Sequence, residues 1–412
     1  MFYLPLALAL LLNGGIYYVA LQHWFQIAHL ALVVGAFVSL AAYATAIGRL
    51  AGIPRLRVTV IDWFFAAFLW VILASITFHG FLGKEAFLLY FSVFMLGPYV
   101  CARLLSEAGI GKLLRYTVLL GIVGLPFLVW EVILVAETYA NSDRMVLFGR
   151  YFAPGVAGLL IGSLVVLAVA LILRPGIRSL DKRALVVFTV IILPAIWVAV
   201  YMGARGPVVA TLLIIFGLVA FAHWLKLAHR ALLLSMLTAC VLLAVQTLPE
   251  ARIDLYKQMY TSTEEAGNSP MIRRSLYLDA IAMSTESPVH GVGAGNFGIY
   301  ASSFQDYLGS PHSSLLHVLS ELGIIGGLIF GGLIFATFMK LTRLYWGARV
   351  SLETRVIAWL LGALWAFYVV HDQFSGNYFS SMPFYLLTGC VATLTSGVKI
   401  KAMIARRANS WC

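Results

Sequence analysis

The sequence is poor in charge. Asp, Glu, Lys and Arg make up only 11% of the 412 residues, whereas hydrophobic residues make up 62% and the mean hydropathy is +0.94. A soluble domain carries about a quarter charged residues. The composition therefore excludes an ordinary soluble globular protein and indicates a chain that folds in a lipid bilayer.

Cysteine is also scarce. Its four copies, Cys101, Cys240, Cys390 and Cys412, fall in or beside apolar segments or in the C-terminal tail. None lies in a loop that we expect on the outer side of the membrane, so the sequence predicts no disulfide framework.

Several common catalytic motifs are absent. The sequence has no Walker loop, no Asp-x-Asp pair for a metal-bound sugar nucleotide, no His/Cys cluster with zinc spacing and no Gly-x-Ser-x-Gly elbow. We therefore expect neither a metal nor a cofactor. A transferase working on the outer side of the membrane, where ATP is lacking, would need a donor that is already activated and delivered by lipid.

Long apolar runs are what the sequence has instead. A spanning helix needs about 20 apolar residues, and the sequence predicts an all-α polytopic membrane protein of about 12 transmembrane helices. The start Met1-Phe2-Tyr3 has no basic region typical of a signal peptide, so we expect the first helix to be retained. The predicted spans are 3–21, 27–47, 59–78, 85–101, 116–136, 154–173, 185–202, 206–223, 231–248, 313–339, 356–371 and 380–398.

The basic residues predict the orientation. Alternate connections and the C-terminal tail hold 20 of the 28 Lys and Arg residues, which places both termini in the cytoplasm of a bacterial inner-membrane protein. The net charge of +11 then reflects topology and contact with anionic membrane lipids, and no nucleic-acid partner is expected.

One connection is much longer than the others. We divide the chain into helices 1–9 (1–248), a periplasmic helical loop (249–312), and helices 10–12 with a cytoplasmic tail (313–412). Long ordered loops usually carry function. The loop begins with an amphipathic stretch, 249–259, that is either an interfacial helix or a cap on the bundle, and Ser269-Pro270 predicts a helix over 271–283.

Three arginines outside the predicted spans are candidate anion-binding residues. Arg205 lies in a glycine-flanked turn between two spans, and Arg273 and Arg274 lie in the first turn of the predicted loop helix. Cations oppose the helix dipole there, whereas a bound pyrophosphate would make them favourable. The alternative is that they pair with acidic residues or reach phospholipid head groups.

His312 is the candidate general base. We predict it at the second position of the membrane helix that continues as the tenth span, capped by Ser310-Pro311, where the positive helix end lowers the pKa of His312 and keeps the ring neutral. A neutral ring can accept a proton from a sugar hydroxyl. The alternative is an interfacial hydrogen-bonding histidine. Glu321, nine residues later, lies on another face of the helix, and we expect it to make a structural hydrogen bond, possible partners being the loop glycines.

A glycine-spaced run follows Pro288. Its residues Gly293, Gly295 and Asn296 are candidate substrate-binding residues, because consecutive amides can form an anion nest. A plain loop turn is the alternative.

These motifs together resemble the O-antigen ligase and polymerase family. The stretch from His312 through Leu316 and Glu321 to Gly323 and Gly326 is similar to the family signature His-x-x-x-Leu…Glu-x-Gly-x-x-Gly. Upstream, the spacing of Arg273 and Tyr277 resembles the family's Arg-x-x-x-Trp, and the run from Pro288 to Phe297 resembles its Pro-x-x-Gly-x-Gly-x-Gly-Asn-Phe. Arg205-Gly206 resembles the family's Ser-Arg-Gly. The sequence departs from the pattern at Tyr277, at Ser313 and by the second arginine, Arg274; spacing to Tyr277 favours Arg273 as the match.

The resemblance implies a metal-independent, GT-C-like glycosyltransferase. Its donor would be a glycan on undecaprenyl pyrophosphate and its acceptor, for a ligase, a sugar hydroxyl of lipid A–core. Arg205 with Arg273 or Arg274 would hold the pyrophosphate, and His312 would orient or deprotonate the acceptor hydroxyl. From charge alone, Arg144 and Arg150 are expected to complete the cationic pocket.

Four functions compete at this point. Twelve spans and one dominant outer loop favour an O-antigen ligase over a polymerase, and a related oligosaccharyltransferase is a further version. A lipid or solute transporter is the alternative from another class, although Asp62, Glu131 and Glu321 are predicted near span ends rather than at mid-membrane.

Overall fold

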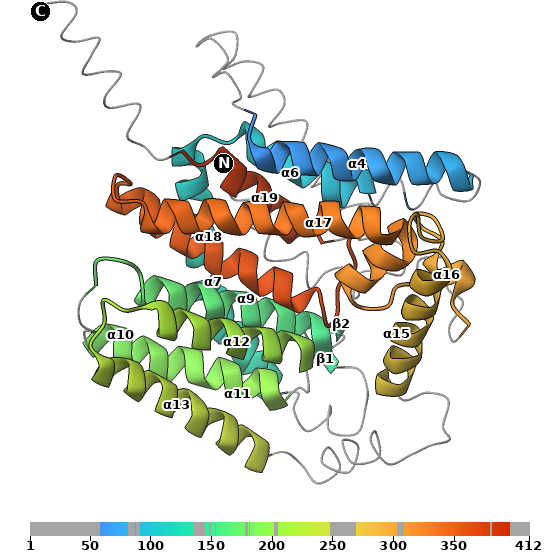
Figure 1. The fold of residues 1–412 in the computed structure, drawn as a ribbon. Coiled ribbons are helices and arrows are strands. Elements are labelled where there is room, and N and C mark those ends of the chain that lie inside the picture. Colours follow the sequence, from blue (N-terminus) through green and yellow to red (C-terminus); the bar gives the residue numbers. More distant parts are fainter. Residues whose placement is uncertain are drawn as a thin grey trace, which may run out of the picture.

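The protein is a bundle of helices (Figure 1). The computed structural model describes residues 58–80, 87, 91–134, 145–147, 150–152, 154–177, 180, 182–201, 205–247, 269–302, 309–379 and 381–395. Within these residues the chain is helical apart from one antiparallel ribbon, in which β1 (Met145–Leu147) pairs with β2 (Arg150–Phe152). The prediction of an all-α membrane protein is confirmed to this extent.

The described helices follow the apolar runs of the sequence. In the first half they are α4 (Val60–His79), the π-helix η1 (Phe91–Leu96), α6 (Gly97–Leu104), α7 (Glu107–Leu134) and α9 (Pro154–Ile172). The middle of the chain forms α10 (Lys182–Val187), the π-helix η2 (Phe188–Ile192), α11 (Leu193–Tyr201), α12 (Arg205–Phe221) and α13 (Leu227–Gln246). The remaining helices are α15 (Ser269–Glu286), α16 (Phe297–Tyr300), α17 (Ser314–Trp346), α18 (Leu352–His371) and α19 (Met382–Thr393).

Four of these helices, α4, α13, α17 and α18, are long and apolar enough to cross a membrane. The predicted spans 3–21 and 27–47 lie outside the described residues, and each of the other ten overlaps a described helix. The total of twelve spans is not confirmed and stays a prediction.

The helices pack in pairs that are distant in sequence. Helix α4 lies against α17, α6 against α19, and α18 against both α9 and α12. Aromatic rings such as those of Phe68, Phe367 and Tyr385 are completely buried between them, whereas Trp70 and Phe335 are exposed on outward faces. Large apolar side chains on the outside of such helices are what a hydrocarbon environment requires.

Helix α15 differs from the spans in direction. It stands nearly at right angles to the long helices, at the end of the bundle where α16, β1 and β2 also lie (Figure 1). The predicted helix 271–283 is present and three residues longer at its end. Leu276, Ala280 and Met283 form its buried face against Phe297, and it packs on α17. The stretch 249–259 lies outside the described residues.

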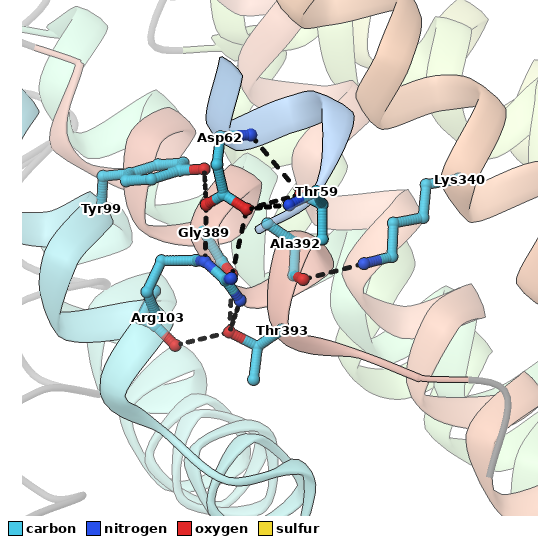
Figure 2. Close-up of polar contacts among 9 residues, drawn as sticks. Thr59, Asp62, Tyr99, Arg103, Lys340, Gly389, Ala392 and Thr393 are labelled. Atoms are coloured by element: carbon cyan, nitrogen blue, oxygen red, sulfur yellow. Dashed lines mark hydrogen bonds and ion pairs between the residues drawn. The ribbon is translucent and has the colours of Figure 1, made fainter. Parts of the chain in front are cut away.

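A polar cluster joins helices at the end of the bundle opposite to α15 (Figure 2). Asp62, in the first turn of α4, accepts hydrogen bonds from Thr59, Tyr99 and Arg103, and the Arg103 Nε to Asp62 Oδ1 distance is 2.7 Å. Arg103 also donates to Thr393 on α19, so α4, α6 and α19 are tied together. The cluster lies about 25 Å from His79, at the opposite end of α4, since a helix rises 1.5 Å per residue.

Candidate functional site

The glycine run lies against a break in α17. Gly323, within α17, has φ +63°, and the chain there cannot continue its helical hydrogen bonds. The run supplies replacements: Val292 N donates to Ser320 O at 2.9 Å, Gly293 N to Glu321 O at 2.9 Å, and Ile324 N to Pro288 O at 2.8 Å. The kink and the run therefore form one structural unit.

The close approach of the two segments requires glycine on both sides. A Cβ at Gly291 would lie 2.3 Å from the carbonyl carbon of Glu321, and one at Gly323 would lie 2.3 Å from the carbonyl oxygen of Val289. Both residues also have positive φ, at +69° and +63°, which only glycine adopts without strain.

The carboxylate of Glu321 occupies the nest formed by this run. It is 1% exposed and accepts hydrogen bonds from Gly295 N at 2.8 Å, Phe297 N at 2.9 Å and the Tyr378 hydroxyl at 2.7 Å. The expected hydrogen bond between Glu321 and the loop glycines is thus present.

The backbone amides of the run have other uses than binding an anion from outside. Gly293 N and Gly295 N donate to Glu321, and Ala294 N donates to Ser75 Oγ on α4 at 2.9 Å. The Asn296 side chain donates to Val292 O. A substrate-binding role for Gly293, Gly295 and Asn296 therefore stays a prediction, and this geometry lends it no support.

His317 stands beside Glu321, one helical turn before it. The ring is completely buried, its Nε2 lies 3.2 Å from Glu321 Oε1, and it packs edge-on against Phe297, Tyr378 and Phe379. No role was predicted for this residue. Its spacing of four from Glu321 was the available signal, since such a pair shares one helix face.

His312 precedes α17 rather than lying inside it. The helix begins at Ser314 with Ser313 as its N-cap, so the predicted cap at Ser310-Pro311 and the predicted helical position of His312 are wrong. Among the described residues, His312 is the one non-glycine with positive φ, at 55°. Such strain persists where surrounding contacts impose it, and it is concentrated at functional sites.

The imidazole of His312 is neutral at pH 7. Burial, followed by the positive charge of Arg273 and by the neighbouring His317 ring, lowers the pKa of His312 to about 4. The lowered pKa agrees with the prediction, but its main cause is burial and not a helix end.

The two arginines of α15 face different ways. Arg273 is half-buried, and its positive charge lowers the pKa of His312. Its Nη1 donates a hydrogen bond to Phe374 O at 3.1 Å. Arg274 is exposed to solvent. The structure therefore brings Arg273, and not Arg274, together with His312.

The loop between α18 and α19, residues 372–379, joins these parts. In this loop, Phe374 O accepts a hydrogen bond from Arg273. Asp372 O accepts one from Ser314 N, at the start of α17, at 2.9 Å. The start of α12 lies against the same loop, because a Cβ at Gly206 would lie 2.7 Å from Ser375 Oγ. The backbone at Arg205-Gly206 thus approaches the loop that holds Arg273. The importance of this loop was not predicted.

Some candidate residues are not tested by the described structure. Arg144 lies outside the described residues. Arg150 lies in β2 and Arg205 is the first residue of α12, and only their backbones are described. Within the described ranges, no group of three His, Cys, Asp or Glu side chains could hold a metal ion.

Comparison with known families identifies the region around the site. Residues 190–331 match the O-antigen ligase family, and this stretch contains Arg205, Arg273, His312 and Glu321. No curated protein matches the chain significantly. The stretch spans the α12 turn, α15, the glycine run and the start of α17, and it confirms the resemblance found in the motifs. Over residues 190–331, the chain is similar to the O-antigen ligase family.

Proposed function

We propose that the protein is an O-antigen ligase of the bacterial inner membrane. It would move O-antigen from undecaprenyl pyrophosphate to a sugar hydroxyl of lipid A–core at the periplasmic face. The observation that carries the proposal is the proximity of the Arg273 charge to a half-buried, neutral His312 with strained backbone, inside the family-matched stretch. A fixed cation and a neutral imidazole are the two groups that such a displacement needs.

In the proposed reaction His312 acts on the acceptor. Its neutral ring takes the proton of the acceptor hydroxyl as the oxygen attacks the anomeric carbon of the donor sugar. A new carbon–oxygen bond forms to the acceptor, and the bond from the anomeric carbon to the pyrophosphate oxygen breaks. The electron pair leaves with undecaprenyl pyrophosphate, and the proton held by His312 is then released to water.

In the same proposal the arginines act on the donor. Arg273 donates to Phe374 O, and we assign it the first pyrophosphate contact because a guanidinium matches the geometry of phosphate oxygens. Arg205 begins α12 beside the same loop, and we assign it the second pyrophosphate contact on the basis of its backbone position. Arg274 is exposed, and we assign it to solvent or lipid head groups instead. Arg144 and Arg150 are kept as additional candidates for the cationic pocket.

The proposed topology places this chemistry outside the cytoplasm. The positive-inside pattern puts Arg103 and Lys340 on the cytoplasmic side, and they lie at the end of the bundle where Asp62 is found (Figure 2). His79, at the other end of α4, would then face the periplasm, on the side of the glycine run. This arrangement, with both termini inside and a periplasmic loop over 249–312, is part of the proposal.

The experiment that tests the proposal is a gel of lipopolysaccharide from cells that lack the gene. Core-only lipid A, with long O-antigen accumulating on undecaprenyl pyrophosphate, is the expected result. Core bearing a single repeat would show a polymerase of the same family instead. An unchanged ladder would overturn the proposal and favour another glycan or transport.

A further inference from the structure

The start of α17 is capped by another part of the chain. The first amides of a helix have no partner within it, and here each of the first three has one outside. Ser314 N donates to Asp372 O at 2.9 Å, Leu315 N to Gln373 Oε1 at 3.2 Å, and Leu316 N to Ser313 Oγ at 3.4 Å. Two of these three acceptors belong to the α18–α19 loop.

Gln373 contributes twice to this cap. Its side-chain oxygen accepts from Leu315 N and also from the Ser313 hydroxyl, at 3.3 Å. Ser313 follows His312 directly, and His312 holds a backbone conformation that non-glycine residues rarely adopt, with φ 55°. The cap therefore fixes the residue next to the strained histidine.

The next residue of the loop contacts the arginine. Phe374 O accepts from Arg273 Nη1 at 3.1 Å. Three consecutive loop residues, 372–374, thus contact the peptide that follows His312 on one side and the guanidinium of Arg273 on the other. Arg273 lies on α15 and His312 precedes α17, and this loop contacts both segments.

We propose that Gln373 is a positioning residue for glycan transfer, because its side-chain oxygen sets the placement of His312 relative to Arg273. The inference rests on the proposed function. Gln373 touches neither reacting atom and acts through Ser313 and Leu315. Asp372 is less suited to the test, because its carboxylate also holds His371 and Ser381.

Two substitutions separate the positioning role from packing. Gln373→Leu keeps a similar volume and removes both the acceptor and the amide that donates to Val369 O at 3.2 Å. Gln373→Glu keeps an oxygen acceptor at that place, and its negative charge is favourable near a helix N-terminus. Ser351→Ala is the matched control: Ser351 caps α18 by accepting from Thr354 N at 3.1 Å, and it lies at the start of that helix, whereas Gln373 follows its end.

The measurement is steady-state transfer from an undecaprenyl-pyrophosphate-linked O-antigen repeat to lipid A–core, with the purified full-length protein. In Gln373→Leu we expect kcat to fall about 10- to 100-fold with the donor KM within about threefold, because a displacement of about 1 Å has that effect on rate. Gln373→Glu restores kcat to within about threefold of the natural protein. Ser351→Ala changes neither constant.

Other results overturn the inference. The inference is wrong if Gln373→Leu has the kcat of the natural protein, or if Ser351→Ala loses as much kcat as Gln373→Leu. It is also wrong if Gln373→Leu raises the donor KM and leaves kcat unchanged. If Gln373→Leu does not fold, Gln373→Asn, which withdraws the acceptor by one methylene, is measured against the same criteria. Absence of transfer by the natural protein would instead refute the proposed function, so the two failures are distinguishable.

Discussion

The Glu321 carboxylate gives the sharpest prediction of stability. It accepts three hydrogen bonds, at 2.7 to 2.9 Å, from Gly295 N, Phe297 N and the Tyr378 hydroxyl, and it is 1% exposed. In Glu321→Gln, one carboxylate oxygen is replaced by an amide NH2 group. If the remaining oxygen keeps Gly295 and Tyr378, the NH2 group faces the backbone N–H of Phe297, and two donors oppose each other.

The magnitude follows from the lost bond. A hydrogen bond to a charged group contributes about 1.5–3 kcal/mol, and a buried donor left without an acceptor costs about 1–3 kcal/mol. Because these ranges partly count the same loss, we expect the free energy of unfolding to fall by about 2–4 kcal/mol. Glu321→Ala leaves all three donors without an acceptor, and its cost is larger.

The assay is thermal unfolding of the purified protein in one detergent. Thr337→Val is the matched control, because Thr337 is equally buried on α17 and donates only to Leu333 O of its own helix. We expect Glu321→Gln to lower the melting temperature by several degrees more than Thr337→Val. Equal melting temperatures would refute the reasoning that Glu321 fastens the glycine run to the kink.

Three further predictions concern the site. For His312, whose pKa is lowered to about 4, kcat/KM should stay level from pH 7 to about 5 and decline only below pH 5, because the neutral base is lost as the pH falls through that pKa. A midpoint near 6.5 would contradict this. His312→Ala should abolish transfer while the protein stays folded. Arg205→Lys should weaken donor binding at least about tenfold, measured by retention of the lipid-linked donor, because an ammonium cannot form the bidentate phosphate contact; equally tight binding would remove Arg205 from the site. Gly291→Ala, where φ is +69° and the new Cβ would lie 2.3 Å from the carbonyl carbon of Glu321, should lower the melting temperature and the folded yield, whereas Gly331→Ala, which meets nothing within 4 Å, should leave both unchanged.

The sequence was informative where one segment determines the result. Apolar length located α4, α17 and α18, and the pair Ser269-Pro270 located the start of α15. The charge and spacing of Arg273 and His312 identified two residues that the structure brings together. These features depend on local composition, which the sequence displays directly.

The features that were missed depend on distant parts of the chain. Ser310 and Ser313 both precede the helix and both suit an N-cap, and Ser313 bonds to Gln373, 60 residues later. The break at Gly323 likewise exists because the glycine run supplies the missing hydrogen bonds. The sequence of α17 alone therefore predicts neither Gln373 as a partner of its N-cap nor the glycine run as the partner of its break.

The cluster around Asp62 has a consequence for the order of assembly. Arg103 on α6 bonds to Thr393 on α19, and 290 residues separate them. Ribosomes add about 5–20 residues per second, so about 15–60 s pass between the synthesis of the two partners. During that interval α6 is present but its partner α19 has not yet been synthesised. A chain stopped after α18 would keep the bond between Arg103 and Asp62 but would lack the contact that joins α6 to α19.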